Sequence, residues 1–542
     1  MRITKPQLAS LLVALALTVC FSAVLTADEP KGLNHKAHPN VVVIMADDLG
    51  FGDLSCYGAT SFKTPHIDQL AAQGRRFTSG YCSASTCTPT RYSMLTGRYA
   101  FRDKGTGIAP PSSPAIIKPG VETLPSILQR AGYKTAVVGK WHLGLGGDEG
   151  PDWNNELKPG PLEIGFDSCF LLPTTNDRVP QVYVKDHRVL NLDPKDPLWV
   201  GKRKPSADHP TGLTHRDTLR MNWSHGHNST IHNGISRIGF YTGGHAARFR
   251  DEDLADKWVE KSIEFIEQNK DKPFFLFFSS HDIHVPRMPH ERFQGKTPHG
   301  FRGDSIIQMD WCVGELMKTL DRLKLAENTL VIFCSDNGPV LDDGYADEAV
   351  EKIGEHRAAG RFSGGKYSVH EGGTRTPFIT RWTGKIAPAV SDEVVCTIDL
   401  AASLAALTEQ KLADDVCVDS FDVMSELLGE EGAAGRDHLV QQDNGKNGTY
   451  GLRVGDWKLH RYDKKKARNV VVEAKLANTP KEPFQLFNLA DDPSESKDVI
   501  KENAEKAEEL KSLLAKILEE GRSRPVAKKD LPVADKELAP AK

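Results

Sequence analysis

The sequence predicts an α/β fold built around a large, mostly parallel sheet, and two observations support this prediction. Residues 40–45, with the sequence NVVVIM, form a continuous apolar run, which is typical of a strand covered on both faces. Apolar runs also occupy residues 274–278 and 330–334, and each follows a stretch with helical periodicity. Beyond about residue 410 the apolar runs are short, so we expect a smaller C-terminal α+β domain with an antiparallel sheet.

Local signals define the other elements of the expected fold. Thr64-Pro65 predicts the start of a helix that ends at Gly74, because Thr is a common N-cap and Pro is common at the first helical position. Helical patterns predict the remaining helices over 88–97, 123–131, 254–266, 306–323 and 505–520. Short apolar runs predict the remaining strands at 77–82, 134–138, 450–454 and 457–462.

The N-terminus predicts export. A basic start is followed by an apolar run over residues 11–27 and then by polar residues, which is the pattern of a cleaved signal peptide over 1–27. The run is short for a membrane span and no other long apolar run follows, so we expect a periplasmic or secreted protein without a membrane span. A lipoprotein signal ending at Cys20 is the disfavoured alternative, because Val19 is bulky where a small residue is expected.

The chain has 542 residues, which is too long for one ordinary core, so we expect more than one domain. We assign residues 38–410 to a main domain, 411–522 to a C-terminal subdomain and 523–542 to a disordered tail. Between about residues 185 and 245 the strand and helix patterns fail, and we expect a long insertion of loops on the outside of the main domain.

Composition and cysteine usage exclude several classes of protein. Charged residues are 26%, hydrophobic residues 39% and the net charge is −4, so nothing indicates a nucleic-acid partner. The nine cysteines are scattered without a CxxC pair, which argues against a zinc site. Cys312 and Cys334 lie in predicted buried elements and are expected to be free thiols. If Cys87 has a role of its own and Cys20 is removed, at least one other cysteine should be unpaired or pair outside the chain.

Oxygen-bearing side chains follow two of the predicted strands. Asp47-Asp48 follows residues 40–45, and Asp336-Asn337 follows residues 330–334. Because ligands of parallel sheets bind beyond the carboxyl ends of the strands, the two pairs are expected to share one site. Four oxygen ligands without His or Cys suit a hard cation, Ca²⁺ or Mg²⁺. The alternative is that each pair only caps a turn or a helix, but two pairs after two apolar strands favour a metal site.

Cationic side chains follow other predicted strands. Lys140 and His142 stand in GKWHLG after one strand, His281 and His284 follow another, and Lys366 ends the segment GGK. Each of them alone is more commonly a solvated or hydrogen-bonded residue. Their recurrence at one edge of one sheet suits an anionic substrate, whose charge must be neutralised and whose leaving group must be protonated.

The segment CTPTR at 87–91, followed by LTGR at 95–98, resembles the signature of the type I sulfatases. Other segments occur in the order expected for that family, namely DDLG at 47, GKWHLG at 139, HVP at 284, SDNG at 335, GGK at 364 and EGGTRTP at 371. The resemblance covers most of residues 38–500 and implies an alkaline-phosphatase-like catalytic domain over 38–410. It implies a sulfatase that hydrolyses sulfate monoesters of a sulfated carbohydrate or an aryl sulfate.

The resemblance also implies that a formylglycine-generating maturation enzyme oxidises Cys87 to Cα-formylglycine, or 3-oxoalanine. The hydrate of this aldehyde would be the nucleophile, because one hydroxyl can attack sulfur and the other can drive release of sulfate. Arg91 would hold the hydrate. Ca²⁺, rather than Mg²⁺, would be bound by the four oxygen-bearing residues, which are Asp47, Asp48, Asp336 and Asn337.

The remaining roles implied by the resemblance concern substrate binding and proton transfer. Lys140 and Lys366 would bind the sulfate oxygens, and His284 would bind the substrate and protonate the leaving alcohol. His142 would take a proton from the second hydroxyl of the hydrate. Many family members have a hydroxyl after the GKWHLG segment that contacts sulfate, and Thr175 is our choice for that position.

Several alternatives stay open from the sequence. A structural hydrogen bond is favoured for His281, whereas His370 is either in the pocket or on the surface. The insertion forms either a basic rim for a sulfated polysaccharide or a solvated loop. Its basic residues are Lys185, Arg188, Lys202, Arg203, Lys204, His215, Arg216, Arg220, His225, His227 and His245. The function could instead be that of a phosphate or phosphonate monoester hydrolase, or of an inactive glycan-binding protein if Cys87 is not modified.

Overall fold

A computed structural model of the chain describes residues 38–443, 449–462 and 482–525. The predicted signal peptide and most of the predicted tail therefore lie outside the described residues. Among the described residues the core element is a ten-stranded sheet. Its strands in spatial order are β16 (Ala389–Cys396), β2 (Arg75–Tyr81), β15 (Phe378–Arg381), β13 (Thr329–Ser335), β1 (Asn40–Ala46), β12 (Phe274–Ser279), β3 (Lys134–Lys140), β4 (Ser168–Leu172), β5 (Val184–Lys185) and β6 (Arg188–Val189).

The centre of this sheet is parallel, and its flanks are mixed. β1 pairs in parallel with β12 and with β13, and β3 continues the parallel arrangement between β12 and β4. β15 runs antiparallel to both β13 and β2. The predicted α/β class with a large, mostly parallel or mixed sheet is therefore confirmed.

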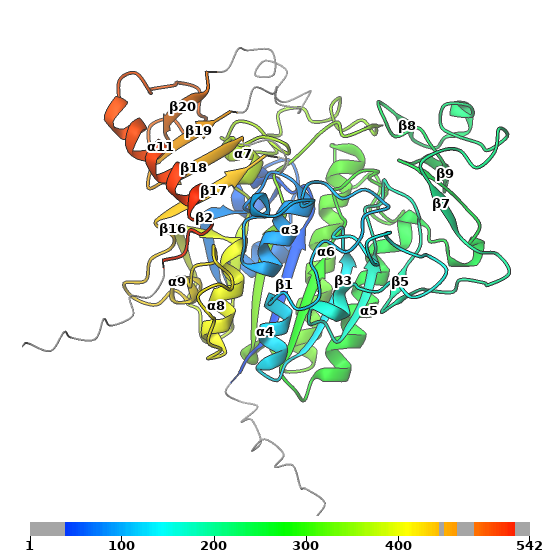
Figure 1. The fold of residues 1–542 in the computed structure, drawn as a ribbon, viewed down its shortest axis with the longest axis horizontal. Coiled ribbons are helices and arrows are strands. Elements are labelled where there is room, and N and C mark those ends of the chain that lie inside the picture. The colour runs from blue at the N-terminus through cyan, green and yellow to red at the C-terminus, as the bar shows by residue number, and fades with distance from the viewer. Residues whose placement is uncertain (1–37, 444–448, 463–481, 526–542) are drawn as a thin grey trace, which may run out of the picture. The chain divides into compact units, whose positions relative to one another are not determined.

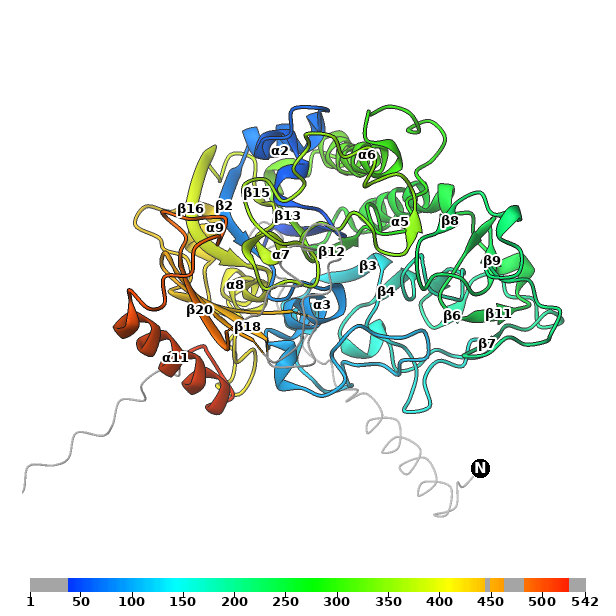
Figure 2. The ribbon, with the colours of Figure 1, turned by 90° about the horizontal axis from the view of Figure 1, so that it is seen from above.

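Helices cover both faces of the sheet, which explains the continuous apolar runs in its central strands. On one face Val41 and Val43 pack with α3 (Cys87–Thr96), α4 (Leu124–Arg130) and α8 (Leu400–Leu407). On the other face Val42 and Ile44 pack with α2 (Pro65–Ala72), α5 (Leu254–Asn269) and α6 (Gly300–Arg322). Figure 2 shows the two helical layers on opposite sides of the strands.

The C-terminal part forms the expected antiparallel sheet. Its strands, in order, are β17 (His438–Gln442), β18 (Tyr450–Val454), β19 (Trp457–Arg461) and β20 (Phe484–Asn488). α11 (Ala504–Glu519) packs against this sheet and buries Leu510 and Leu514 among the strand residues Leu452, Leu459 and Leu486. Figure 1 shows α11 lying across β18 and β19.

The insertion is more ordered than the predicted loops. β7 (Trp199–Gly201) pairs with β11 (Phe240–Thr242), β9 (Ile231–His232) pairs with β10 (Ile235–Ser236), and β8 (Asn222–Trp223) pairs with β14 (Tyr345–Ala346). His227, which was grouped with the exposed basic residues, is buried, whereas the other ten side chains of that group are exposed. The segment therefore contains short paired strands where only loops were expected, because strands of two or three residues leave no periodic pattern in a sequence.

A buried polar cluster joins the C-terminal sheet to the loop before α7 (Glu371–Thr374). His370 Nδ1 lies 3.3 Å from Glu495 Oε2, and His460 Nε2 lies 2.8 Å from Glu495 Oε1. Two histidines and a carboxylate could hold a metal, but Lys458 Nζ already lies 3.2 Å from the same Glu495 oxygen and supplies the cation. The surface interpretation of His370 is therefore wrong, because its side chain is buried beside Glu495.

All eight cysteines among the described residues are unpaired, and all except Cys56 are buried. The expected free thiols at Cys312 and Cys334 are confirmed. At least one cysteine besides Cys87 is therefore unpaired, as expected.

Candidate active site

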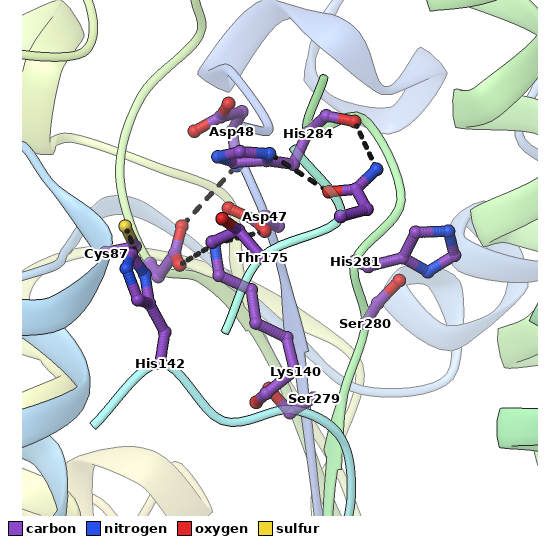
Figure 3. Close-up of polar contacts among 12 residues, drawn as sticks. Asp47, Asp48, Cys87, Lys140, His142, Thr175, Ser279, Ser280, His281 and His284 are labelled. Atoms are coloured by element: carbon purple, nitrogen blue, oxygen red, sulfur yellow. Dashed lines mark hydrogen bonds and ion pairs between the residues drawn. The ribbon is translucent and has the colours of Figure 1, made fainter. Parts of the chain in front are cut away.

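The carboxyl ends of neighbouring strands bring most of the predicted site residues together. β13, β1, β12 and β3 are adjacent in the sheet, and Asp47-Asp48 follows β1 while Asp336-Asn337 follows β13. Lys140 is the last residue of β3. All five side chains are buried, and Figure 3 shows Asp47, Asp48 and Lys140 close together.

Three of the four oxygen-bearing residues are joined by hydrogen bonds. Asn337 Nδ2 donates to Asp48 Oδ1 at 2.7 Å, and the backbone N–H of Asp48 donates to Asp336 Oδ1 at 3.4 Å. One oxygen of Asp47, one oxygen of Asp48 and one ring nitrogen of His284 all lie within 4.8 Å of each other. This arrangement places two of the predicted metal ligands beside the predicted acid.

The donor atoms fit a hard divalent cation. Asp47 Oδ1 and Asn337 Oδ1 are buried and have no hydrogen-bond partner among the described residues. Burial, reinforced by Asp336, raises the pKa of Asp47 well above its ordinary value, and burial also raises the pKa of Asp48. A dication held by these oxygens would satisfy the orphaned atoms and favour both carboxylates in their ionised form.

Three buried cations surround the carboxylates. Lys140 Nζ lies 2.5 Å from Asp47 Oδ2, and Lys366 Nζ lies 2.9 Å from Asp48 Oδ2. Arg91 Nε donates to Asp336 Oδ2 at 2.9 Å. Arg91 Nη1 donates to the Ser279 hydroxyl and to the backbone carbonyl of Lys140. These hydrogen bonds fix the orientation of the guanidinium. These cations can neutralise an anion that binds between them.

Cys87 faces His142 at the start of α3. Cys87 Sγ lies 3.1 Å from His142 Nδ1, and Figure 3 shows the two side chains directed at each other. His142 Nε2 lies 3.0 Å from the carbonyl of Ala109, which can only accept, so Nε2 carries the hydrogen and Nδ1 presents its lone pair to Cys87. Burial and the charge of Lys140 lower the pKa of His142 well below its ordinary value, so the ring is neutral near neutral pH. The Thr88 hydroxyl donates to the His142 carbonyl at 3.0 Å and holds this loop against α3.

His284 has the opposite tautomer. Its Nδ1 lies 2.7 Å from the Val285 carbonyl and 3.1 Å from Asn176 Oδ1, so Nδ1 carries the hydrogen and Nε2 is left for the site. Burial, Lys140 and Lys366 lower the pKa of His284 well below its ordinary value. His281 lies apart from this cluster in Figure 3 and accepts a hydrogen bond from Trp258 Nε1 at 3.0 Å. The predicted structural hydrogen bond of His281 is therefore confirmed.

Thr175 lies after β4 and is fully buried, but its hydroxyl already has protein partners. It donates to Asp177 Oδ1 and accepts from Arg178 Nη1 at 2.9 Å. Asp177 and Arg178 were not singled out from the sequence, although they follow a strand of the same sheet as the other site residues. The rule that polar residues after parallel strands form the site could have found them.

Asp343 and Tyr367 are also absent from the predicted site. Asp343 Oδ2 lies 2.9 Å from Lys366 Nζ, and the Tyr367 hydroxyl lies 3.0 Å from Asp343 Oδ1. Burial opposes the charge on Lys366, but Asp343 and Asp48 outweigh it and hold the pKa of Lys366 well above its ordinary value. Asp343 lies in a loop without a strand or helix pattern, so no sequence signal marked it.

One edge of the sheet thus carries buried carboxylates, two lysines, an arginine and two histidines of opposite tautomer. Together these groups define a hydrolase of anionic esters. The family model named Sulfatase matches residues 39–410, and the chain belongs to this family. It is accordingly a sulfuric ester hydrolase, of a family that generally depends on a metal and on formylglycine.

Known proteins show similarity over most of the chain. It is 47% identical over 479 residues to an N-acetylgalactosamine-6-O-sulfatase of Bacteroides thetaiotaomicron, covering 88% of this chain and 93% of that protein. It is 32% identical to human arylsulfatase A, covering 86% and 84% of the two chains. A solved sulfatase structure from work on glycosaminoglycan metabolism by Bacteroides thetaiotaomicron has a TM-score of 0.85 and 45% identity, with coverage of 89% and 100%.

Among the residues that the structure describes, none of the helices combines the length and the apolar character needed to cross a membrane.

Proposed function

We propose that the chain is a formylglycine-dependent carbohydrate sulfatase in which Cys87 is the modified residue. The observation that supports this most directly is the contact of 3.1 Å between Cys87 Sγ and the lone pair of His142 Nδ1, at a helix start beside three buried cations. A buried thiol is a poor nucleophile here, because burial raises the pKa of Cys87 above its ordinary value. The same position suits a residue whose hydroxyl proton is removed by a neutral histidine.

The proposed substrate is a sulfated sugar of the N-acetylgalactosamine 6-sulfate type. The basis for this choice is the 47% identity to a protein named for that activity, over almost its whole length. Removal of a 6-sulfate from a terminal or internal sugar is the reaction class we infer.

We assign the metal to Asp47, Asp48, Asp336 and Asn337, and we propose Ca²⁺ because all four offer oxygen atoms. The ion would act as a Lewis acid at the sulfate, and the formylglycine hydrate would supply the attacking oxygen. The remaining steps rest on the side chains of this chain. Lys140, Lys366 and Arg91 would stabilise the negative charge of the sulfate as it develops.

The two histidines divide the proton transfers between them. His142 is neutral with its lone pair directed at position 87, so it acts as the base at that residue. His284 keeps its Nδ1 hydrogen on the Val285 carbonyl, so its Nε2 is the atom that takes up a proton when the anionic sulfate binds and passes it to the leaving alcohol. The start of α3 adds backbone N–H groups and the positive end of the helix dipole, both of which favour an anion.

We further propose that the protein is exported to the periplasm or secreted, and that a formylglycine-generating enzyme modifies Cys87 first. The support is the signal-peptide pattern over 1–27 and the CTPTR segment at 87–91. Fractionation of cells that express the full chain tests the first point, because an exported protein loses residues 1–27 and leaves the cytoplasm.

The function is tested by mass spectrometry and by kinetics on the same preparation. Conversion of Cys87 to formylglycine should lower the mass of its tryptic peptide by about 18 Da. The modified enzyme should hydrolyse nitrophenyl sulfate and N-acetylgalactosamine 6-sulfate, and Cys87→Ala should abolish both activities. Faster turnover of nitrophenyl phosphate than of nitrophenyl sulfate would favour a phosphate or phosphonate monoester hydrolase instead. An unmodified Cys87 peptide without activity would favour a glycan-binding protein.

A further inference from the structure

Arg178 differs from the other cations of the site because its side chain is partly exposed. The Arg178 side chain is 17% exposed, whereas those of Arg91 and Lys140 are completely buried. Arg178 nevertheless lies close enough to the site for its charge to act on His142 and His284. It therefore lies between the buried cluster and solvent, where the organic part of a substrate would have to emerge.

Only one nitrogen of Arg178 is used by the protein among the described residues. Nη1 donates to the Thr175 hydroxyl at 2.9 Å and to the two oxygens of Asp177 at 3.0 and 3.1 Å. Nη2 and Nε make no hydrogen bond within the described part of the chain. The protein thus holds the guanidinium through Nη1, and the N–H groups of Nη2 and Nε remain to bind an external acceptor.

Asp177 is itself held by the insertion. His227 Nε2 lies 3.0 Å from Asp177 Oδ2, and His227 Nδ1 lies 2.9 Å from the carbonyl of His225. The Arg178 guanidinium and the His227 ring hold the pKa of Asp177 well below its ordinary value despite its burial, so Asp177 accepts as a carboxylate. Both ring nitrogens of His227 therefore face oxygen acceptors, and the ring holds Asp177 from the side of the insertion.

The insertion is fixed to the site at a second point. β8 pairs with β14, and the Ser224 hydroxyl donates to Asp342 Oδ1 at 2.6 Å, next to the Asp343 that binds Lys366. Gly344 leaves room for the His227 ring, since a Cβ at Gly344 would lie 1.8 Å from His227 Nδ1. Its φ of +111° also favours glycine. Figure 1 shows β8 with the strands of the insertion.

We propose that Arg178 is the residue that selects a sugar as the leaving group, and that Asp177 and His227 position it. Resting on the proposed function, this inference assigns the free N–H groups of Arg178 to acceptor oxygens of the sugar that carries the sulfate. Hydroxyl, ring and amide oxygens all accept from a guanidinium, and a nitrophenyl leaving group has none of them near its sulfate ester. Arg178 would therefore bind the sugar and contribute little to the chemistry at sulfur.

The test compares two substrates in one enzyme. Arg178→Ala should lower kcat/KM for N-acetylgalactosamine 6-sulfate by about 10- to 100-fold, the usual effect of losing a hydrogen bond to a charged donor. The loss should appear mainly as a higher KM, and it should exceed any change in kcat/KM for nitrophenyl sulfate by at least about tenfold. The matched control is Arg203→Ala, which removes an exposed arginine of the same insertion and should alter neither substrate.

The positioning role has its own variants. His227→Leu should reproduce the selective rise in KM for the sugar sulfate, and His227→Gln, whose amide can still donate to Asp177, should restore most of the affinity. Point variants are preferable to deleting the insertion, because a deletion also removes the β8–β14 pairing. Thermal unfolding of each variant shows whether a loss of activity comes from misfolding. A folded His227→Leu enzyme with the wild-type KM for the sugar sulfate would overturn the positioning role of His227.

The outcomes separate this inference from the proposed function. Equal losses on both substrates in Arg178→Ala, or no loss on either, would overturn the assignment of Arg178 and leave a carbohydrate sulfatase intact. A wild-type enzyme that cleaves nitrophenyl sulfate but not the sugar sulfate would overturn both the sugar substrate and the role of Arg178.

Discussion

Replacing Lys140 by methionine tests whether the buried carboxylates are arranged for a dication. Lys140 Nζ lies 2.5 Å from Asp47 Oδ2 and 3.9 Å from Asp336 Oδ2, and all three side chains are completely buried. Lys140→Met keeps much of the side-chain length but removes the charge. In the absence of a metal, Asp47 then has no cation within salt-bridge distance in the described part of the chain.

The magnitude follows from these contacts. Breaking a buried ion pair by removing one partner costs about 3–5 kcal/mol, so the metal-free variant should lose that much unfolding free energy. A bound dication would replace the missing charge, and it would also no longer be repelled by Lys140. Unit charges about 4 Å apart interact by about 4 kcal/mol at an effective dielectric constant of 20, so after relaxation metal binding should strengthen by roughly 1–3 kcal/mol.

Urea unfolding of wild type and variant, each in excess Ca²⁺ and in chelator, measures this coupling. The destabilisation by Lys140→Met should be smaller in Ca²⁺ than in chelator, although turnover falls because the sulfate loses a cation. Lys458→Met is the matched control, because Lys458 is equally buried and lies 2.7 Å from Glu371 Oε1. The control should lose the same free energy in both conditions, and an identical loss for Lys140→Met in Ca²⁺ and chelator would refute the metal assignment.

Three further predictions concern single residues. His142→Ala should lower kcat for nitrophenyl sulfate by about 10²- to 10⁴-fold, the usual contribution of a general base, with the fold kept by circular dichroism. Asp53→Asn should cost about 3–5 kcal/mol in urea unfolding, since it breaks a buried pair with Arg302. The pKa of Asp53 is lowered to about 2, so its stabilisation of the wild type is present above its ordinary value of 3.8 and is lost as the pH falls through about 2. Burial lowers the pKa of His460 from 6.5 to about 3, so the unfolded chain takes up a proton first, and the wild type loses stability as the pH falls between these values. His460→Gln should make that loss shallower by about 1.4 kcal/mol per pH unit, and an unchanged slope would contradict the assignment.

The central part of the site could be predicted because a parallel sheet converts sequence order into spatial proximity. Once residues 40–45 and 330–334 were identified as buried strands, the acidic residues after each of them had to lie at the same sheet edge. The same logic placed Lys140 beside Asp47. The predicted position of these residues depended on the apolar runs, because a strand that is apolar at every position is typical of one covered on both faces.

The outer part of the site could not be predicted in this way. The contact between His227 and Asp177 spans fifty positions, and β8 pairs with a segment more than a hundred positions away. Strands of two residues have no alternation, and a histidine that becomes buried by bonding a carboxylate looks like any other histidine in a basic segment. Thr175 shows the same limit, because its partners Asp177 and Arg178 are visible only in three dimensions.

The opposite tautomers of His142 and His284 explain how two similar residues take different roles. The Ala109 carbonyl holds the hydrogen on His142 Nε2, whereas the Val285 carbonyl holds it on His284 Nδ1. Burial and the charge of Lys140 lower the pKa of both rings, and Lys366 also lowers the pKa of His284. Both rings are therefore neutral before substrate binds. An anionic sulfate bound between Lys140, Lys366 and His284 opposes the lysine charges and favours a proton on His284 Nε2. His142 is directed at position 87 instead, so the substrate itself would make His284 the acid while His142 remains the base.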